Sequence, residues 1–180
     1  MGIVPATMEE LTAREALHRL VVTYSRAVDR RDFGLLRSLY DDEAYEKHGD
    51  MFQGGPDEYV AFVRRAVSAY DTTVHYVVHA LFEVRGDEAE GEVHKLNYHR
   101  TGGDAPHEIV TGSRSLDRYR KAGGAWRFLS RSITLDWAVK REVSAQAYQD
   151  FAAGSPPGRA GPDDLSYHAL RWFGRANPTE

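Results

Sequence analysis

The sequence predicts an α+β fold, in which helices from the first part of the chain pack on one face of a curved, mainly antiparallel sheet. Apolar residues before position 71 recur at spacings of three and four, which is typical of amphipathic helices. From residue 72 onward, long segments rich in β-branched and aromatic residues alternate with glycine-containing turns. Helices followed by a run of strands indicate the α+β class.

Three helices are expected. The first spans residues 8–29, and Thr12 with Glu15 has the spacing of a capping box near its start. The second spans 33–40, with Asp32 as its N-cap. The third spans 56–71, because a proline at its first position and acidic residues in its first turn favour a helix start.

Four long strands are expected over 72–84, 88–100, 107–121 and 126–139. They exceed the usual strand length of about 5–6 residues, so we expect strong curvature and β-bulges. Residues 44–54 add a short strand pair. The folded domain is expected over 1–151. Residues 152–180 form a Gly/Pro-rich tail whose aromatic segment, 166–173, is expected to cover the pocket or a neighbouring subunit.

Composition limits the partners. The chain of 180 residues has 23 basic and 27 acidic residues, a net charge of −4, and no basic block, so nucleic acid and membrane partners are not expected. Cysteine is absent, which excludes disulfides and thiolate chemistry. The start of the chain resembles no secretory signal, and no apolar run reaches the length of a membrane span. We expect a cytoplasmic protein that acts on a small molecule.

Arg131 interrupts an apolar row in the last predicted strand. In WRFLSRSITLDW (126–137), alternation puts it on one face with four hydrophobic residues: Leu129, Ile133, Leu135 and Trp137. An unpaired buried cation costs several kcal/mol, on the order of the values known for buried ions. Arg131 therefore either pairs with a buried carboxylate, lines a polar cavity, or is turned outward by a bulge.

Other polar residues also lie where apolar ones are expected. His75 and His79 share a strand face in simple alternation, but at four strand residues (~13 Å) apart they cannot share a metal ion. Asp29 lies in the last turn of the first helix, where the helix dipole disfavours a carboxylate. Taken singly, these side chains are satisfied or solvated structural residues, and Tyr24 is an ordinary core aromatic.

Taken together, the same residues predict a catalytic site. A curled sheet can bring side chains from the first helix, the first long strand and the last strand into one cavity. Asp29 would fix the tautomer of His75 and raise its basicity, leaving the other ring nitrogen to act as a general base. Arg131 and Tyr24 would stabilise a developing oxyanion or a leaving group.

The chain resembles the SnoaL-like branch of the nuclear transport factor 2-like superfamily, and within it scytalone dehydratase, bile acid 7α-dehydratase and hexachlorocyclohexane dehydrochlorinase. The resemblance covers residues 8–140. The matching segments are YSRAVDRRDF (24–33), LLRSLYDDEA (35–44), HGDMFQGGPDEY (48–59), TVHY (73–76), YHR (98–100) and WRFLSR (126–131).

The resemblance implies a cone-shaped α+β barrel with a deep pocket, no metal or organic cofactor, and a homo-oligomer, with a trimer favoured over a dimer. It assigns catalytic roles to Asp29, His75 and Arg131, with Tyr24 at the dehydratase tyrosine and His99 as a second pocket histidine. The other residues expected to bind substrate are Tyr45, His48, His79, Tyr98 and Ser113. Which way Ser113, Ser115 and Ser130 face stays open, as it does for Tyr98 and His99.

The function expected is a dehydratase-type lyase acting on a medium-sized apolar, aromatic or polycyclic hydroxylated molecule. The same base would also serve an isomerase or an aldehyde-releasing lyase. A small-molecule binding protein without turnover is the alternative from another class, because one scaffold of this kind hosts many functions.

Overall fold

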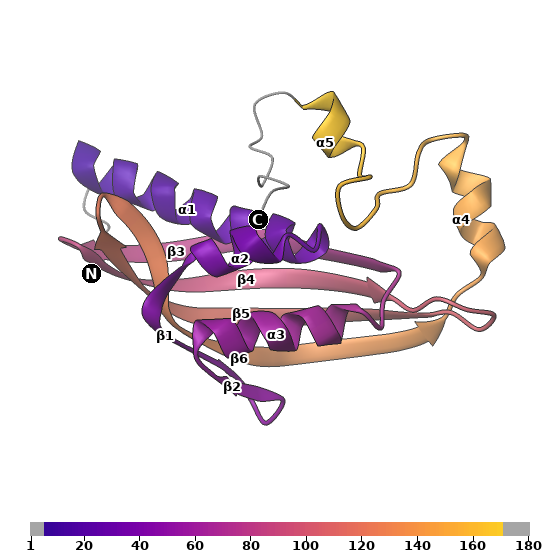
Figure 1. The fold of residues 1–180 in the computed structure, drawn as a ribbon, viewed down its shortest axis with the longest axis horizontal. Coiled ribbons are helices and arrows are strands. Elements are labelled where there is room, and N and C mark those ends of the chain that lie inside the picture. Colours follow the sequence, from indigo (N-terminus) through magenta and orange to yellow (C-terminus); the bar gives the residue numbers. More distant parts are fainter. Residues whose placement is uncertain (1–5, 171–180) are drawn as a thin grey trace.

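The structure is a computed structural model that describes residues 6–170. Three helices pack on one face of a six-stranded sheet, a short helix follows beyond the end of the sheet, and a second short helix lies near the C-terminal end of the first helix (Figure 1). The elements in chain order are α1 (Met8–Asp29), α2 (Phe33–Ser38), β1 (Tyr40–His48), β2 (Phe52–Gly54), α3 (Pro56–Val67), β3 (Thr72–Arg85), β4 (Glu88–Arg100), β5 (His107–Ala122), β6 (Ala125–Glu142), α4 (Ala145–Ala152) and α5 (Ser166–Ala169).

The helix α1 begins earlier than predicted. The capping box is formed by Thr7 and Glu10, whose side chains each accept a hydrogen bond from the other residue's backbone N–H. Thr12 instead donates its hydroxyl to the carbonyl of Met8. The predicted box at Thr12 and Glu15 is therefore wrong, because a threonine inside a helix can satisfy its hydroxyl with the preceding turn.

The two shorter helices follow the predicted pattern but end sooner. Asp32 caps α2 as expected, since its side chain accepts the Leu35 N–H at 2.9 Å. Pro56 opens α3, and two acidic residues lie in its first turn. The chain already forms strand β1 at Tyr40, and α3 ends at Val67 rather than at residue 71.

The sheet has the strand order β2-β1-β6-β5-β4-β3. Strand β1 is parallel to β6 and every other neighbouring pair is antiparallel, so the sheet is mixed. Register shifts interrupt β1/β6, β3/β4 and β5/β6. Such bulges bend and twist a sheet, and here they curve it around α1 and α3 as an open cone (Figure 1).

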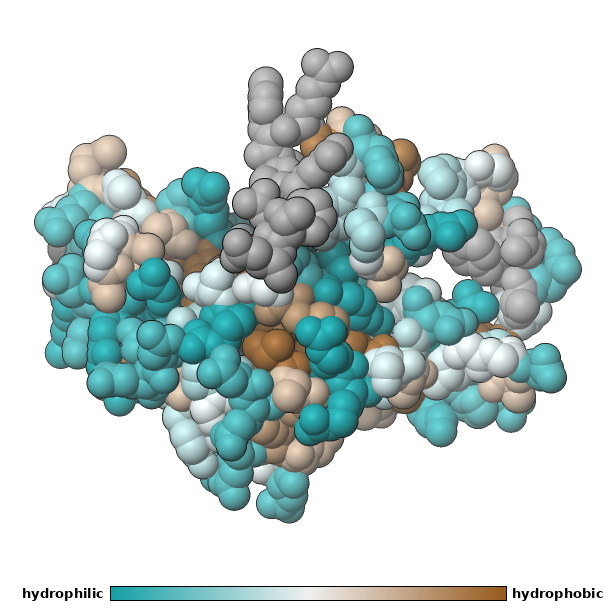
Figure 2. Space-filling model, viewed as in Figure 1, coloured by the Kyte–Doolittle hydropathy of each residue, from teal (hydrophilic) through white to brown (hydrophobic). Residues whose placement is uncertain are grey.

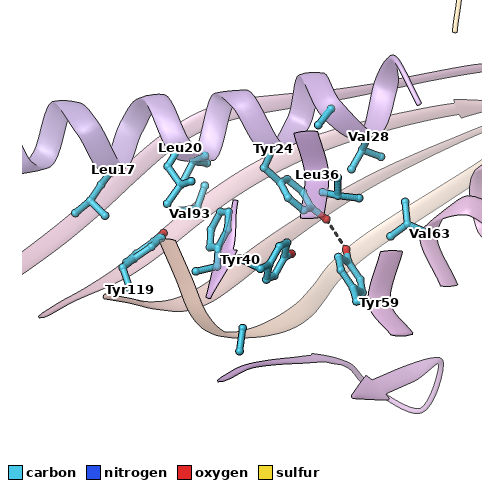
Figure 3. Close-up of a cluster of buried hydrophobic side chains, with 14 of the residues drawn as sticks. Leu17, Leu20, Tyr24, Val28, Leu36, Tyr40, Tyr59, Val63, Val93 and Tyr119 are labelled. Atoms are coloured by element: carbon cyan, nitrogen blue, oxygen red, sulfur yellow. Dashed lines mark hydrogen bonds between the residues drawn. The ribbon is translucent and has the colours of Figure 1, made fainter. Parts of the chain in front are cut away.

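The hydrophobic core lies between α1 and the inner face of the sheet (Figure 3). Leu17 and Val21 of α1, and Val93 of β4, have no exposed surface. Each such side chain contributes roughly 1.5–3 kcal/mol through burial. The helix-bearing face is largely hydrophilic around one hydrophobic patch near the middle of the view (Figure 2).

The C-terminal segment returns to the end of α1. Asp164 is 3% exposed and forms an ion pair with Arg30, with Arg30 Nε 3.1 Å from Asp164 Oδ1. Ser166 accepts hydrogen bonds from the guanidinium of Arg26, and the Tyr167 ring lies 5.1 Å from that guanidinium carbon. Within the aromatic segment 166–173, residues Ser166–Ala169 form α5, and residues 171–173 lie outside the described range.

Within residues 6–170, no helix combines the length and apolarity needed to cross a membrane.

Candidate active site

The register of the sheet decides which side chains face the helices, because directly paired residues on neighbouring strands point to the same side. His75 pairs with Asn97, which pairs with Thr111. This row faces α1, since His75 is bonded to Asp29. Two further rows face the same way: Thr73 with His99, and Val77 with Lys95 and Ser113. We call this the inner face.

Asp29 is the last residue of α1, where the helix dipole disfavours it, and Arg31 supplies compensating charge. Arg31 has φ +59°, a left-handed conformation that is unusual for a residue other than glycine. Its guanidinium donates to the carbonyl of Val28 at 2.9 Å, to that of Val67 at 3.2 Å and to the hydroxyl of Thr73 at 2.8 Å. These bonds fix the end of α1 against α3 and β3, and so fix Asp29.

Asp29 holds His75 at two points. Its Oδ1 lies 2.6 Å from Nδ1 of the imidazole, and its Oδ2 accepts the backbone N–H of His75 at 2.9 Å. The two side chains are 10% and 15% exposed. A carboxylate at Nδ1 favours the tautomer with the proton on that nitrogen, so Nε2 is left with a lone pair.

A second histidine borders this pair. The ring of His99 packs edge-on to His75 at 5.2 Å and lies 4.8 Å from the Tyr70 ring. Burial, and then the neighbouring His75, lower the pKa of His99 to about 4. His99 is therefore neutral at pH 7 and can act as a hydrogen-bonding group rather than as a cation.

Arg131 faces inward and is paired with a carboxylate. It is 1% exposed, and its Nε donates to Asp117 at 3.0 Å across the β5/β6 ladder. Its Nη1 donates to Tyr40 at 3.3 Å. A bulge between Phe128 and Ser130 changes the alternation, so Arg131 shares the inner face with Phe128 rather than with Leu129.

The Tyr24 hydroxyl is bonded to the hydroxyl of Tyr59 within the core (Figure 3). Burial raises the pKa of Tyr24 to about 12. The guanidinium carbon of Arg131 lies 4.1 Å from the Tyr24 ring centroid, and Lys95 Nζ lies 4.6 Å from it. Tyr24 therefore contacts both Arg131 and Lys95, while no contact of the described residues joins Arg131 directly to Asp29 or His75.

The sequence pattern of the SnoaL-like domain family matches residues 9–132 of this chain. The chain belongs to the SnoaL-like domain family. The search of curated proteins found no match for it.

Solved structures agree with this SnoaL-like fold. A protein from Novosphingobium aromaticivorans DSM 12444 assigned as a scytalone dehydratase has 21% identity and a TM-score of 0.68, with 76% of this chain and 92% of that chain covered. Hexachlorocyclohexane dehydrochlorinase LinA-type3 from Novosphingobium barchaimii LL02 has 20% identity and a TM-score of 0.67, with 78% and 96% covered. An NTF2-like protein with a cystatin-like fold from Novosphingobium aromaticivorans has 21% identity and a TM-score of 0.61, with 80% and 92% covered. At these identities the likeness shows the fold, which is the predicted NTF2-like cone.

Several residues predicted to line the pocket of this SnoaL-like protein do not meet the Asp29–His75 pair. A bulge at Val78 turns His79 to the outer face, where it stacks on His94. Tyr98 also faces outward and donates to Glu108. Tyr45 is 50% exposed because its strand neighbours, Ala44 and Glu46, point inward. These three placements correct the simple alternation expected from the sequence.

The remaining predicted residues lie in two places. His48 is bonded to Glu46 at 2.7 Å and packs against Tyr59 of α3, away from the pair. Ser113 faces inward in the row next to His75 and accepts a hydrogen bond from Asn97. Ser115 also faces inward and donates to Asp117, whereas Ser130 pairs with outward-facing Arg118.

Lys95 and Asn97 of this SnoaL-like protein were not predicted as site residues. They are 7% and 8% exposed and lie on the inner face in the rows of Val77 and His75. The signal was present, because in the segment KLNYH (95–99) alternation places Lys95, Asn97 and His99 on one face. Among residues 6–170, no cluster of three or more histidine and acidic side chains has the arrangement needed to hold a metal ion.

Proposed function

We propose that this SnoaL-like protein is a cofactor-independent lyase that removes water from a medium-sized apolar, aromatic or polycyclic hydroxylated molecule. The observation that carries the proposal is the hydrogen-bonded pair of Asp29 and His75 on the inner face of the sheet. The dehydratase and dehydrochlorinase names of the structural neighbours are in keeping with an elimination reaction.

His75 Nε2 would take a proton from a carbon next to the carbon that bears the hydroxyl. The C–H electron pair becomes the new double bond, the C–O bond breaks, and the imidazolium returns the proton to the leaving oxygen as water. Asp29 stabilises the imidazolium between these steps and keeps its ring in place. The reaction as written needs no electron carrier.

Arg131 and Tyr24 are the proposed groups for the developing negative charge. Arg131 Nη2 is buried and has no hydrogen-bond partner, so it is the donor that remains after Asp117 and Tyr40 occupy the other nitrogens. A charged donor inside a low-dielectric site stabilises an oxyanion more than it would in water. The guanidinium of Arg131 also contacts the Tyr24 ring, with its carbon 4.1 Å from the ring centroid.

The outer face of the sheet supports the expected homo-oligomer. Tyr76 and Trp137 belong to one register row there, and they are 54% and 49% exposed. Leu81 and Leu116 share the row of Glu92, two rows away on the same face, and are 70% and 43% exposed. The row of His79, His94 and Arg114 lies between them. Large exposed apolar side chains on one face mark an association surface in a soluble protein, and we propose that a second copy of this chain covers this face.

The test is a panel of hydroxylated aromatic and polycyclic compounds, assayed by mass spectrometry for loss of water. His75→Ala should lower turnover about 10²–10⁴-fold, the usual contribution of a general base, and Asp29→Asn should lower it less. His79→Ala is the matched control, since His79 lies on the same strand but on the outer face. Full turnover in His75→Ala would contradict the proposed role of His75 as the base.

The same panel separates the alternatives that share this base. Isomerisation gives a product of unchanged mass, and an aldehyde-releasing lyase gives free formaldehyde. Binding of panel compounds without any product, in wild type and His75→Ala alike, would favour the binding protein.

A further inference from the structure

Lys95 lies one register row from the base. His75 pairs with Asn97, and Lys95 is two residues along the same strand, on the same face. That spacing is roughly 7 Å along β4. Arg131 pairs through Asp117 with Gly91, which is roughly 20 Å along β4 from Asn97. By register, Lys95 is therefore the cation closer to His75.

The amine of Lys95 has no counter-ion. Within residues 6–170 it forms no hydrogen bond and no ion pair, and its contact is with the face of the Tyr24 ring. Each nearby carboxylate has a partner other than Lys95: Asp29 bonds His75, Asp117 bonds Arg131, and Glu46 Oε1 bonds His48, while Glu46 Oε2 is buried without a hydrogen-bond partner. Lys95 is 7% exposed.

The surroundings favour the neutral amine. Burial and then the positive charge of Arg131 lower the pKa of Lys95 to about 7, against the opposing effects of Asp117, Glu46 and Asp29. A desolvated lysine next to another cation is the usual form of a nucleophilic amine. An ordinary lysine, by contrast, keeps only on the order of 0.04% of its amines neutral at pH 7.

Asn97 supplies a fixed acceptor one register row from Lys95. Its Nδ2 donates to Thr111 at 3.1 Å and to Ser113 at 2.9 Å, which sets the orientation of the amide. Its Oδ1 is buried and has no hydrogen-bond partner. An unpartnered buried acceptor of this kind calls for a ligand donor.

We propose that Lys95 is a nucleophilic amine that forms an imine with carbonyl compounds, and that the substrate therefore carries an aldehyde or ketone group. The nitrogen lone pair attacks the carbonyl carbon to give a carbinolamine, whose hydroxyl can donate to Asn97 Oδ1. A proton transfer and loss of one water molecule give the protonated C=N bond, and addition of water later returns the carbonyl and the free amine.

This inference rests on the proposed function for its catalytic meaning. A protonated imine withdraws electrons from the neighbouring carbon, so a C–H bond there loses its proton to His75 more readily. The elimination would then proceed on a substrate held through Lys95. Formation of the imine itself requires Lys95 and does not require His75.

The test uses the full chain at about pH 7 with formaldehyde and, separately, benzaldehyde, each with cyanoborohydride to reduce any imine. The chain has four lysines, of which Lys47, Lys121 and Lys140 are exposed. Peptide mass mapping should show Lys95 alkylated at least about tenfold faster than these three, since its neutral fraction is so much larger. The preference should shrink near pH 10, where the other amines also lose protons.

Lys95→Arg retains a cation but cannot form an imine, and Lys140→Arg is the matched surface control. The expected result is loss of the fast adduct in Lys95→Arg only, with unchanged circular dichroism in both variants. The inference would be overturned if neither aldehyde alkylates Lys95 faster than it alkylates the exposed lysines. Measuring both adduct formation and turnover in His75→Ala separates the two proposals. A Lys95 adduct together with full turnover would contradict the role of His75 as the base and leave the imine intact. Lost turnover without a Lys95 adduct would contradict the imine and leave the role of His75 intact.

Discussion

The Asp29 carboxylate contacts His75 at two points: Asp29 Oδ1 lies 2.6 Å from the imidazole Nδ1, and Oδ2 accepts the His75 backbone N–H at 2.9 Å. The double contact ties the orientation of the ring to the position of β3. It also explains why a carboxylate persists at the unfavourable end of α1. Arg31 offsets the negative charge of Asp29 there, and its own backbone adopts a left-handed conformation.

The buried ion pair of Arg131 and Asp117 should contribute strongly to stability. Both side chains have no exposed surface. Removing one partner leaves an uncompensated buried charge, so Arg131→Met and Asp117→Asn should each lower the free energy of unfolding by about 3–5 kcal/mol. Urea denaturation measures this.

A surface pair provides the control for that prediction. Arg114 contacts Asp136 on the outer face, and both side chains are about one-third exposed (34% and 36%). Arg114→Met should therefore change stability by less than about 1 kcal/mol. Equal losses in Arg114→Met and Arg131→Met would contradict the assignment of Arg131 as a buried structural charge.

His99 should stay neutral well below the usual histidine range. Burial beside His75 lowers the pKa of His99 from 6.5 to about 4. Between these two pH values the side chain is therefore protonated in the unfolded chain and neutral in the folded chain. Stability is therefore fully present above pH 6.5 and is lost as the pH falls toward 4, by on the order of 2 kcal/mol. The C2–H resonance of His99 should not titrate between about pH 8 and 5; a midpoint near 6.5 would contradict its burial.

The C-terminal segment should detach when Asp164 loses its charge. Asp164 binds Arg30, and it accepts hydrogen bonds from the backbone N–H groups of Arg159 and Ser166. Its pKa falls to about 2, as these bonds outweigh burial. Asp164→Asn should therefore speed proteolysis between residues 153 and 165. Asp163→Asn is the adjacent control, and equal cleavage of the two variants would show that Asp164 does not anchor the segment.

The outer face should control association. Trp137 packs over Gly112, where a Cβ would lie 2.2 Å from the indole nitrogen, so this ring is fixed and outward-facing. Trp137→Asp should shift the mass measured by light scattering toward the monomer because it places a charge in an apolar contact. Lys140→Asp is the control at the same end of β6. A wild-type protein that is monomeric at all concentrations would contradict the proposed contact between copies.

The sequence anticipated the α+β class and the helix–strand order because these depend on periodicity. It anticipated the Asp29–His75 pair, 46 residues apart, because both polar residues lie where apolar ones are expected and because they match the family resemblance. It placed His79 on the wrong face because the alternation of side chains shifts by one residue beyond a bulge, and the bulge at Val78 has no recognisable signal in the sequence. For Arg131 it left inward and outward positions open, and simple alternation grouped this residue with Leu129, whereas a bulge puts it on the inner face with Phe128. Its partner Asp117 could not be foreseen, since that contact depends on the register between strands.

For Lys95, the strand face could be predicted from the sequence but the burial could not. Its parity with Asn97 and His99 was visible in the sequence, but a lysine on a strand is ordinarily solvated. Only the packing of Tyr24 over its amine, and the occupation of nearby carboxylates by other partners, reveal it as an unpaired buried group.

The most direct test of the central claim is the tautomer of His75, measured by nitrogen-15 NMR of the histidine-labelled protein above the pH at which the ring is charged. The geometry predicts a proton on Nδ1, facing Asp29, and a bare Nε2, with this preference lost in Asp29→Asn. A proton found on Nε2 in the wild-type protein would leave the ring without an acceptor for a substrate proton and would contradict the account.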